Sequence, residues 1–140
     1  MQLINFPPEL SCEDYQNANS DILTILTKYF PHSTIYTLGG AWLNPGISDL
    51  DYLIVSSGRI NGNLLHRSNY PKKYIENGIM YHSPFAISSQ TFKWIRRLTS
   101  YNFKCASGHP LNILPSNKES NILKLALYII INYPMRFAEE

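Results

Sequence analysis

Apolar side chains fall into short periodic runs along the first 60 residues, and their spacing changes from helical to extended. Between residues 11 and 30 they recur at helical spacing. Ser11 or Ser20 can cap this helix, and Pro31 stops it. Residues 34–38 and 50–55 are β-branched, aromatic and aliphatic, and predict two strands. The first 60 residues thus predict a helix followed by two strands.

The second half has weaker periodicity and more turn residues. Residues 57–72 are rich in Gly, Asn and Ser, which predicts a loop. Asn77-Gly78 stands between two short mixed runs, which predicts a hairpin. Ser88 or Ser89 caps a helix that continues to Leu98, and a last helix is expected over 120–133. The order predicts a mixed α/β (α+β) domain in which helices flank a small sheet.

Composition narrows the class of protein. A chain of 140 residues with 44% hydrophobic and 16% charged residues predicts one globular domain over 1–140. The net charge of +2 gives no argument for a nucleic-acid partner. The start lacks the pattern of a secretion signal, and the apolar stretch 122–131 is far below the ~20 residues that cross a bilayer. Two cysteines make neither a disulfide framework nor a zinc pattern, so we expect a cytoplasmic protein without a membrane partner.

Two aspartates at the start of the second predicted strand carry the clearest chemistry. Asp49 and Asp51 stand one residue apart, and residues i and i+2 of a strand project from the same face. Two adjacent carboxylates repel unless a positive charge lies between them, and Mg²⁺ or Mn²⁺ takes such oxygen ligands. Aspartate is also a common turn residue, but Asp51 lies inside an apolar run, where an unpaired charge is costly. The pair therefore predicts a divalent-metal site.

A glycine pair stands at the end of the first predicted strand. Gly39 and Gly40 are separated from Asp49 by eight residues. Glycine adopts backbone conformations that other residues avoid, and it lets the backbone approach a phosphate closely. Glycines and acids together predict a magnesium-dependent phosphate site.

The segment from Tyr36 to Val55, with its glycine pair and Ser-Asp-Leu-Asp sequence, resembles the nucleotidyltransferase superfold. That group includes minimal nucleotidyltransferases, CCA-adding enzymes and DNA polymerase β. The resemblance implies that Gly39 and Gly40 contact phosphates, that Asp49 and Asp51 are catalytic metal ligands, and that Ser48 shapes the turn before them. It also implies a nucleoside triphosphate, with ATP favoured, as the substrate.

Members of this superfold carry a third carboxylate on a later strand, as general base or second-metal ligand. By spacing, that strand resembles residues 79–83, which contain no acid. Residues 52–118 contain one acidic residue, Glu76, which is one candidate for the missing group. His82 is a candidate base, although a lone histidine is more often structural or exposed.

Two functions follow from the resemblance. The first is transfer of a nucleotidyl group to a hydroxyl of a small molecule, a protein side chain or an RNA end. The second is a weakly active or inactive nucleotide-binding or regulatory protein of the same fold, as one half of a toxin–antitoxin or defence pair with a small protein partner. The apolar helix expected over 120–133 is either core or the interface of a homo-oligomer.

Overall fold

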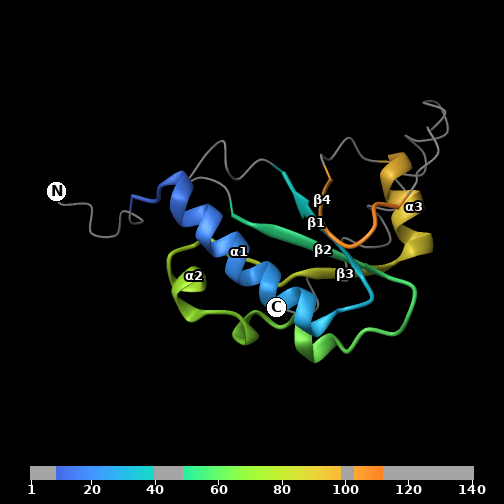
Figure 1. Cartoon of the computed structure of the whole chain (residues 1–140), viewed down its shortest axis with the longest axis horizontal. Coiled ribbons are helices and arrows are strands. Elements are labelled where there is room, and N and C mark those ends of the chain that lie inside the picture. The colour runs from blue at the N-terminus through green and yellow to red at the C-terminus, as the bar shows by residue number, and fades with distance from the viewer. Residues whose placement is uncertain (1–8, 40–48, 99–102, 112–140) are drawn as a thin grey trace.

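The computed structural model describes residues 9–39, 49–98 and 103–111, with the backbone alone for 94–98. These residues form a mixed α/β fold, as the sequence predicts, in which a four-stranded sheet is flanked by helices (Figure 1). The elements are α1 (Cys12–Tyr29), β1 (Thr34–Leu38), β2 (Asp51–Ser56), the 3-10 helices η2 (Gly62–Leu65) and η3 (Arg67–Asn69), α2 (Lys72–Glu76), β3 (Phe85–Ser88), α3 (Ser89–Leu98) and β4 (Lys104–Ser107). None of the described helices is long and apolar enough to cross a membrane.

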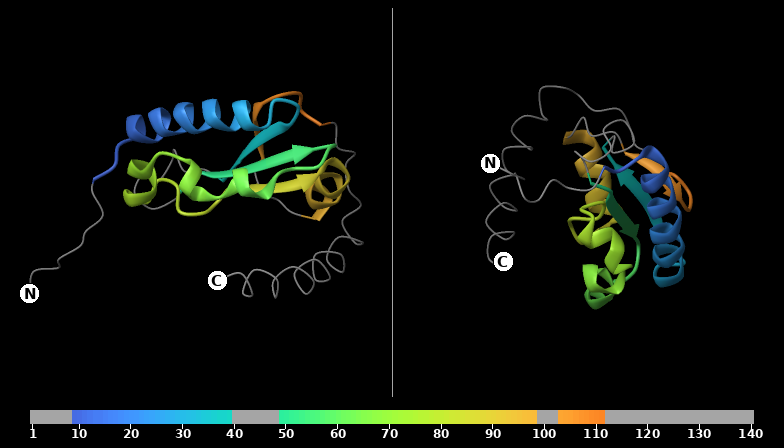
Figure 2. Two further views of the ribbon diagram at one scale, coloured as in Figure 1. Left: turned by 90° about the horizontal axis from the view of Figure 1, so that it is seen from below. Right: turned by 90° about the vertical axis from the view of Figure 1, so that its left-hand side faces the viewer.

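Helix α1 begins where its sequence provides a complete capping box. The backbone N–H of Asp14 donates to Ser11 Oγ at 3.2 Å, and the backbone N–H of Ser11 donates to Asp14 Oδ2 at 2.8 Å. These bonds satisfy donors that the first helical turn leaves unpaired. The helix then runs along one face of the sheet (Figure 2) and buries a stripe at helical spacing, formed by Tyr15, Ala18, Ile22 and Leu26.

The strands lie in the order β3-β2-β1-β4. Strand β1 pairs antiparallel with both β2 and β4, while β2 and β3 are parallel. Because Leu38 pairs with Asp51, the end of β1 and the beginning of β2 meet at one end of the two central strands. This register determines which residues of the two segments come together.

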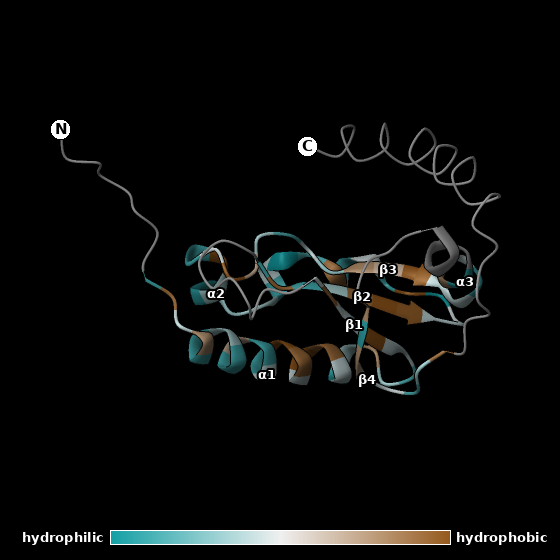
Figure 3. Ribbon diagram, turned by 90° about the horizontal axis from the view of Figure 1, so that it is seen from above, coloured by the Kyte–Doolittle hydropathy of each residue, from teal (hydrophilic) through white to brown (hydrophobic). Residues whose placement is uncertain are grey.

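Side chains of β2 alternate between two hydrophobic clusters on opposite faces, and Figure 3 shows the apolar character of the strands. Tyr52 and Ile54 pack in the cluster that contains the buried stripe of α1. Leu53 and Val55 pack with Phe92 of α3 in the other cluster. Each fully buried aliphatic or aromatic side chain contributes about 1.5–3 kcal/mol of hydrophobic stabilisation. The sheet is therefore buried from both sides.

Several elements are confirmed with small shifts of their ends. The first helix, capped by Ser11, and the strand over 34–38 match the prediction, and β2 begins one residue later than expected. Helix α3 is also confirmed, with Ser88 Oγ accepting a bond from the backbone N–H of Thr91 at 3.0 Å. The loop expected over 57–72 is irregular apart from the two 3-10 helices.

The predicted hairpin at Asn77-Gly78 is wrong. Lys72–Glu76 is a short helix, and its last turn is closed by a bond from the backbone N–H of Asn77 to the carbonyl of Lys73 at 3.1 Å. Gly78 follows with φ +73°, the left-handed conformation that commonly ends a helix. A positive φ at glycine serves both a hairpin turn and a helix end, so the dipeptide does not distinguish them.

Two strands were not predicted, and some predictions cannot be compared. Strands β3 and β4 each have four residues, and their sequences show little periodicity. The strand beside β2 is β3, not residues 79–83. The turn expected around residues 41–46 and the helix expected over 120–133, with its oligomer interface, lie outside the described residues.

Candidate active site

The glycine turn and the acid pair lie at the same end of the central strands. We call this end, with Gly39, Asp49 and Asp51, the acid edge. Gly39 directly follows Leu38, whose partner across the ladder is Asp51. Gly39 has φ +72° and is exposed, and a Cβ built there would meet no atom of the described residues within 4 Å. The position therefore favours glycine for its backbone conformation.

The two aspartates flank a buried leucine at the start of β2. Leu50, which separates them, is 3% exposed and packs in the α1 cluster with Tyr52 and Ile54. Because strand residues alternate, Asp51, the first residue of β2, belongs to the opposite face, where Leu53 and Val55 pack toward α3. Asp49 precedes the strand, so the shared face that the i, i+2 spacing predicts for the two acids stays a prediction.

Asp49 has a feature that a turn residue does not need. Within the described part of the chain, its Oδ2 is a buried side-chain oxygen without a hydrogen-bond partner. No lysine or arginine whose side chain the structure describes forms an ion pair with it. Buried polar atoms in folded proteins are nearly always hydrogen-bonded, so a lone exception calls for a specific explanation. An oxygen ligand that awaits a cation is one such explanation.

The candidates for a third ligand do not gather around this pair. Across residues 9–39, 49–98 and 103–111, no group of three or more His, Cys, Asp or Glu side chains could hold a metal ion. Glu76 forms an ion pair with Lys72 of the same helix at 3.0 Å, and His82 is exposed, with its ring against Tyr81. Among the described residues, the site therefore offers two carboxylates as metal ligands and no third one. Gly40 and Ser48, the other predicted site residues, lie outside the described residues.

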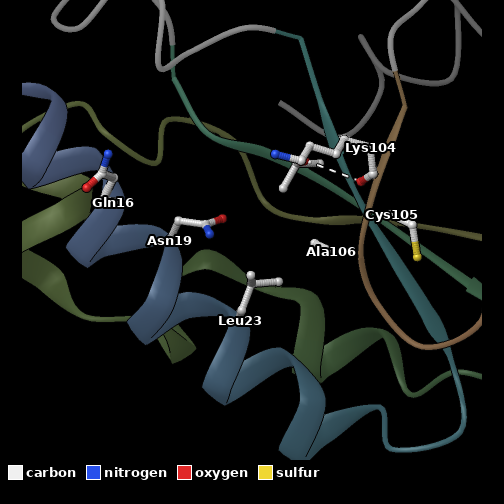
Figure 4. A pocket seen from close by; sticks show the side chains of 7 residues that line it. Gln16, Asn19, Leu23, Lys104, Cys105 and Ala106 are labelled. Carbon is white, nitrogen blue, oxygen red and sulfur yellow. Dashed lines mark hydrogen bonds between the residues drawn. The ribbon is translucent and has the colours of Figure 1, made fainter.

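A hollow of about 500 Å³ lies on the α1 side, between α1 and the outer strand β4 (Figure 4). Asn19 is held there by the hydroxyl of buried Tyr52, which donates to Asn19 Oδ1 at 2.9 Å. The lining offers amides and an ammonium group but no carboxylate, and is formed by Gln16, Asn19, Leu23, Thr37, Lys104, Cys105 and Ala106. Sequence reasoning missed this hollow because it depends on the pairing of β4 with β1. Its chemistry does not suit a metal ion, so the acid edge remains the candidate active site.

Comparison with models of known protein families, with characterised proteins and with solved structures finds no match to this chain.

Proposed function

We propose that the protein binds a nucleoside triphosphate together with Mg²⁺ at the acid edge and transfers its nucleotidyl group to an acceptor hydroxyl. The observation that carries this proposal is the buried, unpartnered Oδ2 of Asp49, one residue away from a second carboxylate. A structural role would give this oxygen a donor. A role in binding a cation requires it to be available.

The donor set fits a hard divalent cation. Carboxylate oxygens are the protein ligands that Mg²⁺ prefers, and Mg²⁺ is commonly bound by one or two carboxylates with the remaining positions taken by water and substrate phosphates. The carboxylates of Asp49 and Asp51 supply that number of protein ligands. Manganese takes the same class of ligands and is a suitable substitute in experiments.

The residues of the edge have separable roles in the proposed reaction. Asp49 and Asp51 hold the cation, which when bound would neutralise charge on the phosphates. Gly39 is a residue without a side chain beside them, so the end of β1 can lie close to a phosphate. The packing of Leu50, Leu53 and Val55 in the two clusters fixes the segment that carries both acids. The backbone would then supply the positioning on which phosphoryl and nucleotidyl transfer largely depend.

A second function is favoured by a specific observation. Within the described residues, the site lacks the third carboxylate that would activate an attacking hydroxyl. A protein that binds the nucleotide without transferring it, and acts through a small protein partner, would need the same two aspartates and no base. Both functions predict metal-dependent nucleotide binding, and only the first predicts product. Their setting in both cases would be the cytoplasm.

The test is a transfer assay with each α-labelled triphosphate in turn, in Mg²⁺ and then Mn²⁺, offering a small-molecule hydroxyl, a protein acceptor and an RNA end. The variants are Asp49→Asn and Asp51→Asn. Asp21→Asn is the matched control, because Asp21 is an aspartate on α1 that contacts Lys73 and Tyr74 instead. We expect label transfer or pyrophosphate release by wild type and Asp21→Asn, and at least a 100-fold loss in the other two.

The outcomes separate the alternatives. Activity that survives in Asp49→Asn and Asp51→Asn would contradict the assignment of these acids. Binding of labelled ATP that requires both aspartates, without product for any acceptor, would favour the second function.

A further inference from the structure

Residues 80–84, in the segment that follows α2, form a bulge beside the start of β2. The backbone N–H of Leu50 donates to the carbonyl of Ile79 at 2.7 Å, and further along Leu53 pairs with Phe85 in the parallel ladder. Between these two anchors, β2 has two residues and the neighbouring segment has five. The extra residues cannot be accommodated in a flat ladder, so residues 81–84 must leave the plane of pairing.

Arg67 holds this bulge in place. Its Nη1 donates to the carbonyl of Tyr81 at 3.3 Å, and its backbone N–H donates to Ser83 Oγ at 3.1 Å. At the inner end of the bulge, Met80 is 0% exposed and packs in the α1 cluster. Arg67 and Met80 therefore fix the backbone of the bulge, which carries Tyr81 and His82 at the surface.

Tyr81 is the large hydrophobic residue that this bulge displays. It is 63% exposed, and no other large hydrophobic residue among the described side chains is exposed. The imidazole of His82 meets its ring edge-on, with ring centroids 5.1 Å apart and an interplanar angle of 82°. Aromatic pairs favour this T-shaped arrangement, in which the edge of one ring lies against the face of the other, so His82 leaves at least one face of the Tyr81 ring available for stacking.

We propose that Tyr81 is a stacking platform for the base of the nucleoside triphosphate bound at the acid edge, a role that rests on the proposed function. Neighbouring strand backbones lie about 4.8 Å apart, so the bulge begins one strand spacing from Asp51. A nucleotide whose phosphates lie at the aspartates can extend its base across that spacing. Aromatic rings stack on any base, so the platform gives affinity for nucleosides with little discrimination among them.

A protein partner is a poorer fit to the same feature. Specific protein interfaces bury about 800 Å² on each side, and they surround a central aromatic with further apolar surface. Tyr81 is instead flanked by a histidine and held by an arginine, and both neighbours can meet the polar edge of a base. One ring with polar surroundings matches a single planar ligand.

The experiment compares two probes, ATP and inorganic tripolyphosphate, each with Mn²⁺, by calorimetric titration. The variants are Tyr81→Ala and Tyr81→Trp, with Asp49→Asn as the reference for the metal site. His32→Ala serves as a surface control because His32 is an exposed residue in the turn between α1 and β1. We expect Tyr81→Ala to weaken ATP about 5- to 150-fold, since this is the range for loss of one stacked base, and to leave tripolyphosphate unchanged. Tyr81→Trp should bind ATP at least as tightly as wild type, and His32→Ala should bind both probes normally.

Each other outcome is decisive. Equal ATP affinity in wild type and Tyr81→Ala, with both probes lost in Asp49→Asn, would overturn the stacking role and leave the proposed function intact. Equal weakening of both probes by Tyr81→Ala would also overturn stacking, because tripolyphosphate has no base. Failure of both probes to bind the wild type would overturn the proposed function and the stacking role together.

Discussion

The α1 face of the sheet and the segment that carries the two acids differ in how their buried polar atoms are satisfied. On the α1 side, three tyrosine hydroxyls lie at the edge of a hydrophobic cluster, and each donates to a partner. Tyr52 donates to Asn19 at 2.9 Å, Tyr70 to the carbonyl of Leu64 at 3.1 Å, and Tyr74 to Asp21 at 2.5 Å. Just before β2, within the described residues, Oδ2 of Asp49 is buried without a partner.

The proposed function explains this difference, because it assigns the tyrosines a structural role and Asp49 a role in binding a cation. A buried polar atom without a hydrogen bond destabilises a protein by about 1–3 kcal/mol, and by more when it is charged. The tyrosines avoid this cost through their partners, so removing a hydroxyl should weaken the fold. Asp49 does not avoid it, so removing its charge should leave the fold unharmed. Three experiments test this contrast, in order of decreasing effect, and a fourth changes a residue outside both regions.

The largest effect is expected from truncating a partnered tyrosine. Tyr52 is 1% exposed, and Tyr52→Ala should lower the free energy of unfolding by about 3–5 kcal/mol because it creates a cavity in the α1 cluster. Urea denaturation followed by circular dichroism measures this change. Asp49→Ala is the comparison, and it should lower the free energy of unfolding by less than about 0.5 kcal/mol. A loss of several kcal/mol in Asp49→Ala would show that this carboxylate is structural.

Removing the hydroxyl alone isolates the hydrogen bond. Tyr52→Phe keeps the ring and leaves Asn19 Oδ1 without its donor, so we expect a loss of about 1–2 kcal/mol in the same denaturation experiment. Binding of Mn²⁺ should be unchanged, because Tyr52 belongs to the opposite face from Asp51. Weakened metal binding in Tyr52→Phe would contradict the separation of the two faces.

The same hydroxyl predicts how stability depends on pH. Burial, and to a smaller extent the nearby Tyr74, raises the pKa of Tyr52 above its ordinary value of 10.0. The neutral form is therefore favoured by folding, so its contribution is complete below pH 10 and is lost as the pH rises above the pKa of the unfolded chain. Stability measured from pH 8 to 11.5 should fall less steeply in Tyr52→Phe than in wild type. If the stability of both proteins falls equally with rising pH, ionisation of Tyr52 is not the cause of the loss of stability at alkaline pH.

The smallest effect is expected at the cap of α1, outside both regions. Ser11→Ala removes the oxygen that accepts from the backbone N–H of Asp14, and should lower the free energy of unfolding by about 0.5–1 kcal/mol. Ser11→Asp, which restores an acceptor, should recover most of the loss. Metal binding should be normal in both variants. An effect above about 2 kcal/mol would mean that the cap also orders the chain before the helix.

The sequence predicts the candidate site better than it predicts its surroundings. The glycine turn and the acid pair follow from local patterns, because antiparallel neighbours in a sheet bring the end of one strand to the start of the next. The bulge at Tyr81 depends instead on which segment pairs with β2, and no local pattern near Phe85 indicates that partner. Strand β4 has the same difficulty, and the hollow beside Asn19 forms only through its pairing with β1.

The most direct test of the central claim is the free energy of unfolding of wild type and Asp49→Asn, each measured by urea denaturation with and without saturating Mn²⁺. The wild type should gain stability from the metal, by about 2.7 kcal/mol when the free concentration is 100 times the dissociation constant. Asp49→Asn should be at least as stable as wild type in the absence of metal and should gain nothing from it. An Asp49→Asn protein that is less stable without metal, yet gains as much from Mn²⁺ as the wild type, would contradict the account.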